Sequence, residues 1–408
     1  MESIKDRVAI VGMGCTEFGE KWDKSSGDLV VDACYEAFED AGVDPQRDIQ
    51  AAWVASCFSQ FTSGYTGQIL SIPLKLEYKP ITRVENFCAS GTDALRNAAY
   101  AVAAGMYDVV LVAGVEKLKD SGFAGLPYVS AIPDPSVTEM MHHSVAPVHF
   151  ALAATRYFYH YNLSPEEGKR ILGKIAVKNH HNGTLSPKAH FRREVTLEQV
   201  INAPMIAWPL GLFDCCGNSD GAAAAIITRA ELAKNFRHDY VLIKGLGMSV
   251  GAKQGELQDD YDFVHFEETV TAGQAAYQEA GITNPRDKLD LAIVHDCFTI
   301  TELIIYEDLG FSPRGRGKED VDSGFFSLDG GLPVNTDGGL KCFGHPIAAS
   351  GLRMVYEVYK QLQGKAGARQ LKDPKIGLTH NLGGVPGNFS TCCVAILGRP
   401  DYPETVQD

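Results

Sequence analysis

Cys88 lies where an expected strand gives way to an expected helix. Val84-Glu85-Asn86-Phe87 reads as a strand end, and Ala89-Ser90-Gly91 opens a segment rich in alanine and glycine that runs to residue 105. Small residues on all sides predict a fully buried central helix, because they let neighbours approach closely. The helix's free N–H groups and dipole would lower the pKa of a thiol placed before it. Cys88 is therefore a candidate nucleophile, although a lone cysteine is more often a small buried apolar residue.

Three other junctions carry reactive side chains. His295-Asp296-Cys297-Phe298 follows an apolar strand expected over 289–294, His345 precedes a helix expected to begin at Pro346, and His380-Asn381-Leu382-Gly383 follows a strand expected over 376–379. Open α/β sheets place their sites at the carboxyl ends of such strands. A histidine there is often only a hydrogen-bonded structural residue, but three such junctions together favour a catalytic site.

A zinc site is the competing interpretation of these residues. Cys342 and His345 have ligand-like spacing, and Cys88, His295 and Cys297 could complete the set. Structural zinc sites usually bring two closely spaced pairs of ligands, and the sequence contains no C-x-x-C motif. We therefore expect no metal.

The composition is that of a soluble, enzyme-sized protein. The chain has 408 residues, of which 45% are hydrophobic and 22% charged, and its net charge is −14. A polyanion needs a cationic face, so nucleic acid is not an expected partner. The sequence has no apolar run long enough to span a bilayer, so no membrane partner is expected. Its ten scattered cysteines indicate a reducing, cytoplasmic location.

One segment is basic, although the chain as a whole is acidic. Residues 166–195 contain seven lysines and arginines and only three glutamates. Such a run is usually a solvated helix face, but in an acidic protein it is also a candidate docking surface for a phosphate-bearing small molecule.

Short apolar strands and helices alternate in two stretches that resemble each other. This pattern predicts an α/β protein built from two similar mixed-sheet halves with helices on both faces of each sheet. We assign residues 1–116 and 206–235 to the first half and 236–408 to the second. Residues 117–205 break the rhythm with prolines and two expected helices, and we interpret them as a substrate-binding insertion.

These motifs together resemble the thiolase superfamily. Asn86-Phe87-Cys88-Ala89-Ser90-Gly91, His295-Asp296-Cys297-Phe298, Gly344-His345-Pro346 and His380-Asn381-Leu382-Gly383 occur in its order and spacing, and are most similar to its sterol-carrier-protein-2-type and archaeal-type branch. The resemblance covers essentially the whole chain. It implies the five-layered αβαβα fold, coenzyme A thioesters and free CoA as substrates, no bound cofactor, and a homodimer or larger assembly.

The resemblance also implies roles for individual residues. Cys88 would attack a 3-oxoacyl-CoA and carry the acyl group, His345 would activate it, and Cys297 would protonate the departing α-carbon. His295 with His345 would form one oxyanion hole, and the backbone N–H groups of Cys88 and Gly383 the other. CoA contacts are expected among His149, Lys169, Lys174, Lys178, Arg192 and Arg193.

The chain departs from the best-known thiolases at two places. Asn381 stands where their second cysteine precedes the final glycines, and His295 replaces the asparagine of their Asn-Glu-Ala-Phe motif. Cys297 is the favoured replacement for the lost thiol, and Cys342 stays open as the alternative. His380 and Asn381 are secondary candidates.

Two other functions use the same sequence. A Cys-His-His set resembles that of decarboxylating ketoacyl synthases, and a non-catalytic thiolase-like scaffold is the alternative of another class. The archaeal-type branch often works beside a small zinc-ribbon and OB-fold protein, so such a partner is expected as a candidate.

The acyl group is the least determined part. Acetoacetyl-CoA is the default substrate, and a bulky one such as benzoylsuccinyl-CoA is the alternative. Aromatic, methionine and histidine side chains of the insertion are candidate wall residues, namely Phe123, Tyr128, Met140, Met141, His142, His143, His149 and Phe150.

Overall fold

The first half of the chain forms one side of a mixed sheet. A computed structural model describes residues 3–58, 64–121, 146–385, 387–388 and 390–402. In spatial order the strands of the first half are β3 (Ile81–Val84), β2 (Ala51–Ala55), β4 (Val109–Glu116), β7 (Gly221–Arg229) and β1 (Val8–Cys15). The pairs β3–β2 and β2–β4 are parallel, whereas β4–β7 and β7–β1 are antiparallel.

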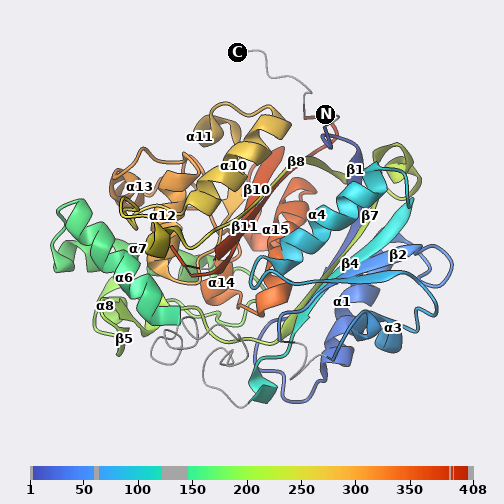
Figure 1. The fold of residues 1–408 in the computed structure, drawn as a ribbon, viewed down its shortest axis with the longest axis horizontal. Coiled ribbons are helices and arrows are strands. Elements are labelled where there is room, and N and C mark those ends of the chain that lie inside the picture. The colour runs from blue at the N-terminus through green and yellow to red at the C-terminus, as the bar shows by residue number, and fades with distance from the viewer. Residues whose placement is uncertain (1–2, 59–63, 122–145, 386, 389, 403–408) are drawn as a thin grey trace.

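The second half repeats this order. Its strands are β8 (Val241–Val250), β11 (Ser390–Gly398), β10 (Ile376–Gly384) and β9 (Leu291–Ile293). The pair β9–β10 is parallel, and β10–β11 and β11–β8 are antiparallel, as in β2–β4–β7–β1. Antiparallel pairing of Ala9 with Leu242 and of Ile10 with Val241 joins the halves into one nine-stranded sheet. The predicted internal repeat is therefore confirmed (Figure 1).

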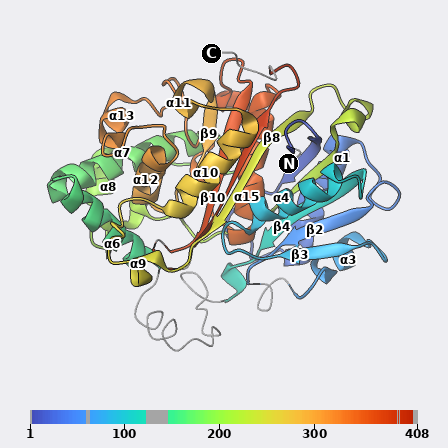
Figure 2. The ribbon, with the colours of Figure 1, turned by 45° about the horizontal axis from the view of Figure 1, so that its top comes forward.

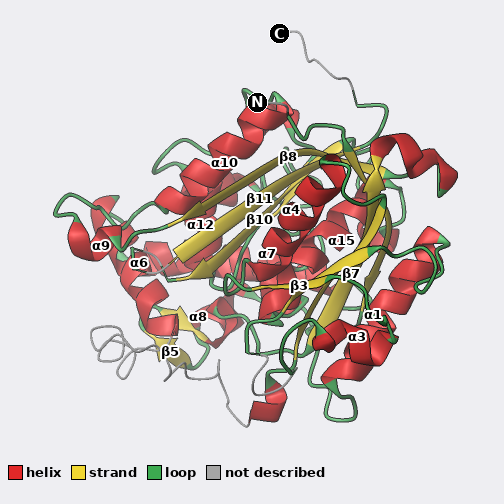
Figure 3. Cartoon of the chain, turned by 45° about the vertical axis from the view of Figure 1, so that its right-hand side comes forward, coloured by secondary structure: helices red, strands yellow, loops and turns green. Residues whose placement is uncertain are grey.

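Helices make the remaining layers. Outside the first half lie α1 (Ser26–Ala41) and α3 (Gln68–Leu74), and outside the second half lie α10 (Glu267–Ala280) and α12 (Thr299–Asp308). Between the halves, α4 (Ser90–Ala103) contacts α15 (Ser350–Leu362). Figure 2 shows α10 and α4 across the strands, and Figure 3 shows the strands of the sheet with helices around them. The expected α/β architecture with helices on both sides of the sheet is confirmed.

The two central helices approach closely because small residues face each other. A side chain added at Gly91 would lie 2.6 Å from the carbonyl oxygen of Ala348, and one at Gly351 would lie 2.4 Å from Thr92 Oγ1. The expectation of full burial for the helix after Cys88 is nevertheless wrong, because the side chain of Tyr100 is 41% exposed. Its inner face alone carries the tight packing.

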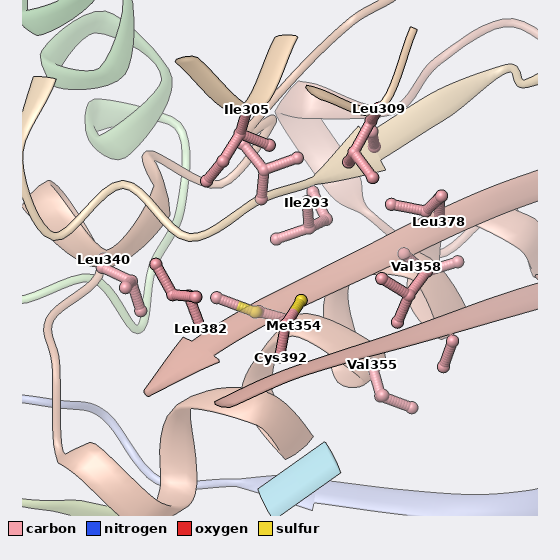
Figure 4. Close-up of a cluster of buried hydrophobic side chains, with 14 of the residues drawn as sticks. Ile293, Ile305, Leu309, Leu340, Met354, Val355, Val358, Leu378, Leu382 and Cys392 are labelled. Carbon is pink, nitrogen blue, oxygen red and sulfur yellow. The ribbon is translucent and has the colours of Figure 1, made fainter. Parts of the chain in front are cut away.

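An apolar core fixes the second half around α15. Met354, Val355 and Val358 of α15 lie beside Leu378 and Leu382 of β10. Ile293 of β9, Ile305 of α12 and Leu309 directly after α12 lie nearby (Figure 4). All of these side chains are buried. Because β9 and β10 end beside this cluster, the residues that follow them are held on a rigid frame.

The segment between β4 and β7 adds no strand to the large sheet among its described residues. It contains α6 (Ala146–His160), α7 (Pro165–Thr184), α8 (Leu197–Ile201) and a two-stranded sheet of β5 (Met205–Ala207) and β6 (Leu210–Gly211). Helix α7 packs on α12, α13 (Gly317–Ser323) and α14 (Gly339–Cys342), which places the segment beside the second half. The candidate wall residues Phe123, Tyr128, Met140, Met141, His142 and His143 lie outside the described residues.

The remaining elements are short. They are α9 (Gln254–Leu257), α11 (Pro285–Lys288) and the 3₁₀ turns Lys119–Ser121, Leu212–Asp214, Ala230–Asn235, Ile347–Ala349 and Gly367–Arg369. The helix expected at Pro346 begins instead as a 3₁₀ turn, and α15 starts at Ser350. None of the helices in the described ranges combines the length and apolarity that crossing a bilayer requires.

Candidate active site

The turn that carries Cys88 is held by hydrogen bonds on both sides. The N–H of Ala89 donates to the carbonyl oxygen of Asn86 at 3.0 Å, and the N–H of Asn86 donates to Ser90 Oγ at 2.8 Å. Phe87 has a φ of +48°, a left-handed conformation that a bulky residue rarely adopts. Strain of this kind is characteristic of sites where the backbone must aim a side chain.

His345 faces the thiol from the second half. Its Nε2 lies 3.2 Å from Cys88 Sγ, and its Nδ1 lies 2.7 Å from Ser350 Oγ. The Ser350 hydroxyl donates to the carbonyl oxygen of Pro346 at 3.0 Å, so its lone pairs accept from Nδ1–H. This chain of bonds assigns the proton to Nδ1 and leaves Nε2 as the acceptor for the thiol proton.

His295 completes the group. Its ring lies 5.3 Å from the ring of His345, edge to face, and ligand atoms of Cys88, His295 and His345 all lie within 4.8 Å of one another. The amide Nδ2 of Asn381 donates to His295 Nδ1 at 3.3 Å. Asn381 Oδ1 in turn accepts from Thr92 Oγ1 at 3.3 Å, which fixes the orientation of the amide. His295 is therefore neutral with its proton on Nε2.

The three groups line an apolar cavity of about 420 Å³. Its walls include the side chains of Phe150, Phe191, Phe213 and Phe298, with Cys215, Cys216 and Cys297 among them. Cys297 is buried, and its Sγ lies 3.7 Å from Thr301 Oγ1. The first turn of α12 thus holds one of the two thiols left open by the sequence at the cavity wall.

Cys342 lies elsewhere. It is fully buried on α14 and packs on α7, where a side chain added at Gly183 would lie 2.7 Å from its Cβ. It is not among the residues that line the cavity. Helix α14 ends at Cys342 and Gly344 has a φ of +118°, so the three-residue spacing to His345 does not bring both side chains to the cavity.

His380 also points away from the cavity. Its Nε2 lies 3.0 Å from Thr269 Oγ1, and its Nδ1 accepts from the backbone N–H of His295 at 3.5 Å. It supports the backbone that carries His295, and does not line the cavity.

The pKa of Cys88 is shifted in the direction opposite to the one expected from the sequence. Burial, with the nearby Glu116 carboxylate, raises the pKa of the Cys88 thiol to about 12. Backbone N–H groups of Cys88 and Gly384 oppose the shift but are weaker. Desolvation therefore exceeds the effect of the helix N-terminus, because α4 begins two residues later, at Ser90.

Burial acts on the histidines in the opposite direction. Desolvation, with the charge of Arg353, lowers the pKa of His345 to about 3, and desolvation also holds the pKa of His295 well below its usual range. Burial holds the pKa of the Cys297 thiol well above its usual range. The resting site therefore contains neutral thiols and neutral imidazoles.

The backbone group beside the thiol belongs to Gly384 rather than to the expected Gly383. Gly384 lines the cavity and its N–H is directed at Cys88. Gly383 instead packs behind the turn, where an added side chain would lie 2.5 Å from the carbonyl oxygen of Asn86. Residues alternate along β10, so a shift of one position exchanges the two faces.

The basic residues expected to contact CoA are mostly paired with carboxylates. Lys169 pairs with Asp214, Lys174 with Asp322 at 2.6 Å and Lys178 with Glu302 at 2.6 Å. His149, Arg192 and Arg193 also do not line the apolar cavity, although their neighbours Phe150 and Phe191 do. The expectation for the lysines and arginines came from the run of basic residues over 166–195, and such a run does not indicate where carboxylates of other segments will lie.

Several residues of the site were not identified from the sequence. Ser350 orients His345, Glu116 accepts from the N–H groups of Cys57 and Phe58 at 3.0 Å near the thiol, and Cys216 and Lys341 line the cavity. The position of Ser350, five residues after His345 and at the start of a helix, was the available indication.

Cys88, His295 and His345 also have the donor types that zinc prefers. A bound zinc ion would require the Cys88 thiol to lose its proton. The ion would also occupy the His345 nitrogen that otherwise accepts this proton.

Models of known families match most of the chain. The model described as "Thiolase, N-terminal domain" matches residues 8–231, and "Thiolase C-terminal domain-like" matches residues 249–399. An acetyl-CoA acetyltransferase of Methanothermobacter thermautotrophicus is 38% identical and covers 96% of this chain and 99% of its own length. Human sterol carrier protein 2 is 32% identical and covers 98% of this chain, which spans 73% of that protein.

A solved structure is also similar. A chain of the Ltp2-ChsH2(DUF35) aldolase is 26% identical, with a TM-score of 0.83 over 98% of this chain and 99% of that one.

Proposed function

The chain belongs to the thiolase family, and from this premise we propose that it cleaves a 3-oxoacyl-CoA with CoA through an acyl group carried on Cys88. Its similarity to acetyl-CoA acetyltransferases supports an acyltransferase. The observation that carries the proposal is the 3.2 Å contact between Cys88 Sγ and His345 Nε2 at the wall of an apolar cavity.

The attack starts from a neutral pair. His345 Nε2 accepts the thiol proton as the Cys88 sulfur adds to the ketone carbon, which matches the raised pKa of the thiol and the tautomer set by Ser350. The charge on the ketone oxygen then needs donors. The backbone N–H groups of Cys88 and Gly384, which act on the Cys88 sulfur, would supply these donors, and removal of one such donor typically costs ~3 kcal/mol of transition-state stabilisation.

Cleavage of the bond between the α and β carbons leaves the acyl group on Cys88 and releases an acyl-CoA enolate. Neutral His295 donates its Nε2–H to the enolate oxygen, since Asn381 occupies Nδ1. Cys297 gives its proton to the α-carbon, because it holds a protonated thiol at the same cavity. The thiol of free CoA then gives its proton to the Cys297 thiolate and attacks the acyl-cysteine, and the departing Cys88 sulfur recovers its proton from His345.

The apolar cavity supports an acyl group of moderate bulk. Its four phenylalanines offer a dry surface, and its volume exceeds the needs of an acetyl group. Acetoacetyl-CoA is the default substrate, and an aryl or branched 3-oxoacyl-CoA is the alternative.

In the deciding experiment, the purified chain is incubated with CoA and one 3-oxoacyl-CoA at a time. The substrates are acetoacetyl-CoA, long-chain 3-oxoacyl-CoA and aryl 3-oxoacyl-CoA, including benzoylsuccinyl-CoA. We expect CoA-dependent formation of two acyl-CoA products by mass spectrometry. Decarboxylation of a malonyl thioester without CoA-dependent cleavage would instead indicate a ketoacyl-synthase-like enzyme. Cleavage of a 3-hydroxyacyl-CoA to an aldehyde or ketone and an acyl-CoA, with no CoA consumed and no cleavage of the 3-oxoacyl-CoAs, would indicate an aldolase, as the similar Ltp2-ChsH2(DUF35) structure is named. Inactivity of the folded chain with every substrate would favour the scaffold.

We propose that the enzyme works as a homodimer or larger assembly, with a small zinc-ribbon and OB-fold protein as a candidate partner. The name of the Ltp2-ChsH2(DUF35) aldolase places a DUF35 protein beside Ltp2 in that structure. Full activity of the isolated chain would contradict an obligate partner, whereas activity only after the partner is added would support it.

A further inference from the structure

A second cavity, which we call the basic cavity, lies apart from the active site. It has a volume of about 420 Å³ and is bounded by the segment after α7, the end of α15 and the loop after α15. It shares no lining residue with the apolar cavity. Among the described residues, its lining contains no carboxylate side chain but five cationic ones, Lys188, Arg192, Lys360, Lys365 and Arg369. This concentration contrasts with the net charge of −14 for the whole chain.

Three of the five cations already have carboxylate partners just outside the lining. Lys188 pairs with Glu36 at 2.6 Å, Lys365 with Asp239 at 2.7 Å, and Arg369 with Glu357 at 2.7 Å. In the part of the chain that the structure describes, no carboxylate lies within ion-pair distance of Lys360 or Arg192. Two positive charges at this cavity are thus not matched by direct ion pairs.

Lys360 packs against two tyrosine rings instead of extending into solvent. Its Nζ lies 5.2 Å from the ring centre of Tyr356 and 5.6 Å from that of Tyr359, and its side chain is half-buried. Asp40 and Glu36 attract it more strongly than Lys365 and Lys188 repel it, but burial outweighs them and lowers the pKa of Lys360. An ammonium group in such a place gains from an anion that approaches from the open side.

Ser186 gives an independent indication of a ligand. It lines the same cavity and is only 1% exposed, and its Oγ has no hydrogen-bond partner among the residues that the structure describes. A buried hydroxyl normally finds a partner, because an unsatisfied one costs free energy. A hydroxyl beside unpaired cations is suited to donate to an anionic oxygen.

We propose that the basic cavity binds a small phosphate-bearing anion. Lys360 and Arg192 supply the charge, and Ser186 Oγ–H donates to one phosphate oxygen. Two cations and a hydroxyl match a tetrahedral dianion better than a carboxylate, which has only two oxygens and one charge. The shared chemistry is the phosphate group, whether it is inorganic phosphate or part of a phosphate ester such as CoA.

The test is calorimetric titration of the purified full-length chain with inorganic phosphate, pyrophosphate, adenosine 3′-phosphate and CoA at constant ionic strength. We expect binding of at least one phosphate probe that Cys88→Ser leaves unchanged, because the site is separate from the thiol. Lys360→Gln with Arg192→Gln should weaken this binding by about a hundredfold, roughly tenfold for each charge-assisted bond. Lys375→Gln, an exposed lysine outside the cavity, is the matched control and should have no effect.

Ser186→Ala separates a ligand role from a structural one. Its hydroxyl has no partner among the described residues, so the variant should fold with unchanged or higher thermal stability and yet bind the phosphate probe several-fold more weakly. Failure of every phosphate probe to bind the wild type overturns the proposal. So does binding that the double variant and Ser186→Ala leave unaltered. Neither result bears on cleavage of 3-oxoacyl-CoA.

Discussion

The turn before α4 and the turn before α15 occupy equivalent places in the two halves but provide different chemistry. In each, a residue with positive φ precedes the reactive one: Phe87 at +48° before Cys88, and Gly344 at +118° before His345. The repeated topology brings the two turns together at the middle of the molecule. The comparison teaches that the repeat determines where reactive residues lie, and that the residue at each turn determines whether it attacks or accepts a proton.

The loops after β2 and β9 extend the comparison. After β9, His295 and Cys297 both line the apolar cavity. After β2, the N–H groups of Cys57 and Phe58 donate to Glu116, and neither residue lines the cavity. Among the described residues, the first half therefore contributes the nucleophile and the second half contributes the proton-transfer groups.

The largest effect should come from loss of the nucleophile. Cys88→Ala should reduce CoA-dependent cleavage by at least about four orders of magnitude, because no acyl-enzyme can form. Steady-state kinetics and mass spectrometry of the trapped acyl-protein measure this. Cys215→Ala is the matched control, since Cys215 lines the same cavity and, among the described residues, its sulfur bonds the carbonyl oxygen of Gly211 and not a histidine. A near wild-type rate for Cys88→Ala would contradict the division of roles between the halves.

The second-largest effect should come from loss of His345, the reactive residue in the turn before α15. His345→Gln should reduce kcat by about 10²–10⁴-fold, because the thiol loses the acceptor for its proton. His380→Gln provides a control with a buried histidine that supports the His295 backbone but does not line the cavity. Kinetics are compared after thermal melts show both variants folded. Equal losses for the two variants would mean that His345 acts only through structure.

Replacement of each of the two candidate thiols in turn should have a smaller and more selective effect on the reaction. Cys297→Ala should slow cleavage by about 10²-fold and slow exchange of the α-proton of acetyl-CoA with solvent deuterium, because the acid for the α-carbon is lost. Cys342→Ala should leave this exchange unchanged, since Cys342 lies against α7 away from the cavity. Proton NMR of the exchange distinguishes the two. The opposite ranking would assign the second thiol to Cys342.

The smallest effect is on pH dependence. The pKa of Cys88 is raised to about 12, so its inactivation by iodoacetamide should accelerate with pH into the alkaline range without a plateau near neutrality. Glu116→Gln removes a negative charge that raises this pKa, and should move the profile to lower pH by less than about one pKa unit. Glu85→Gln should move it less, because Glu85 acts more weakly on the thiol. A plateau near neutral pH in the wild type would show a thiolate–imidazolium pair and contradict the neutral resting site.

Local sequence determined much of the frame. The strand expected to begin at Ile376 begins there in the structure, and the expected alternation of short strands and helices in two similar halves is present as well. These elements combine a clear apolar pattern with boundaries marked by glycine, and both are properties of neighbouring residues. The motifs at Cys88, His295 and His345 also identified the family, because each lies at a junction whose geometry a short segment largely specifies.

Tertiary structure alone decided the electrostatics and the choice between similar residues. The pKa of Cys88 rises instead of falling because desolvation and Glu116 depend on how the two halves enclose the thiol. Lys169, Lys174 and Lys178 are paired with carboxylates from residues 214, 322 and 302, which the sequence does not place beside them. Gly384 rather than Gly383 faces the thiol, because the register of β10 determines which residue points to each face. Sequence therefore determined the reactive types and their order, whereas burial, charge pairing and strand register arise from contacts between segments far apart in the chain.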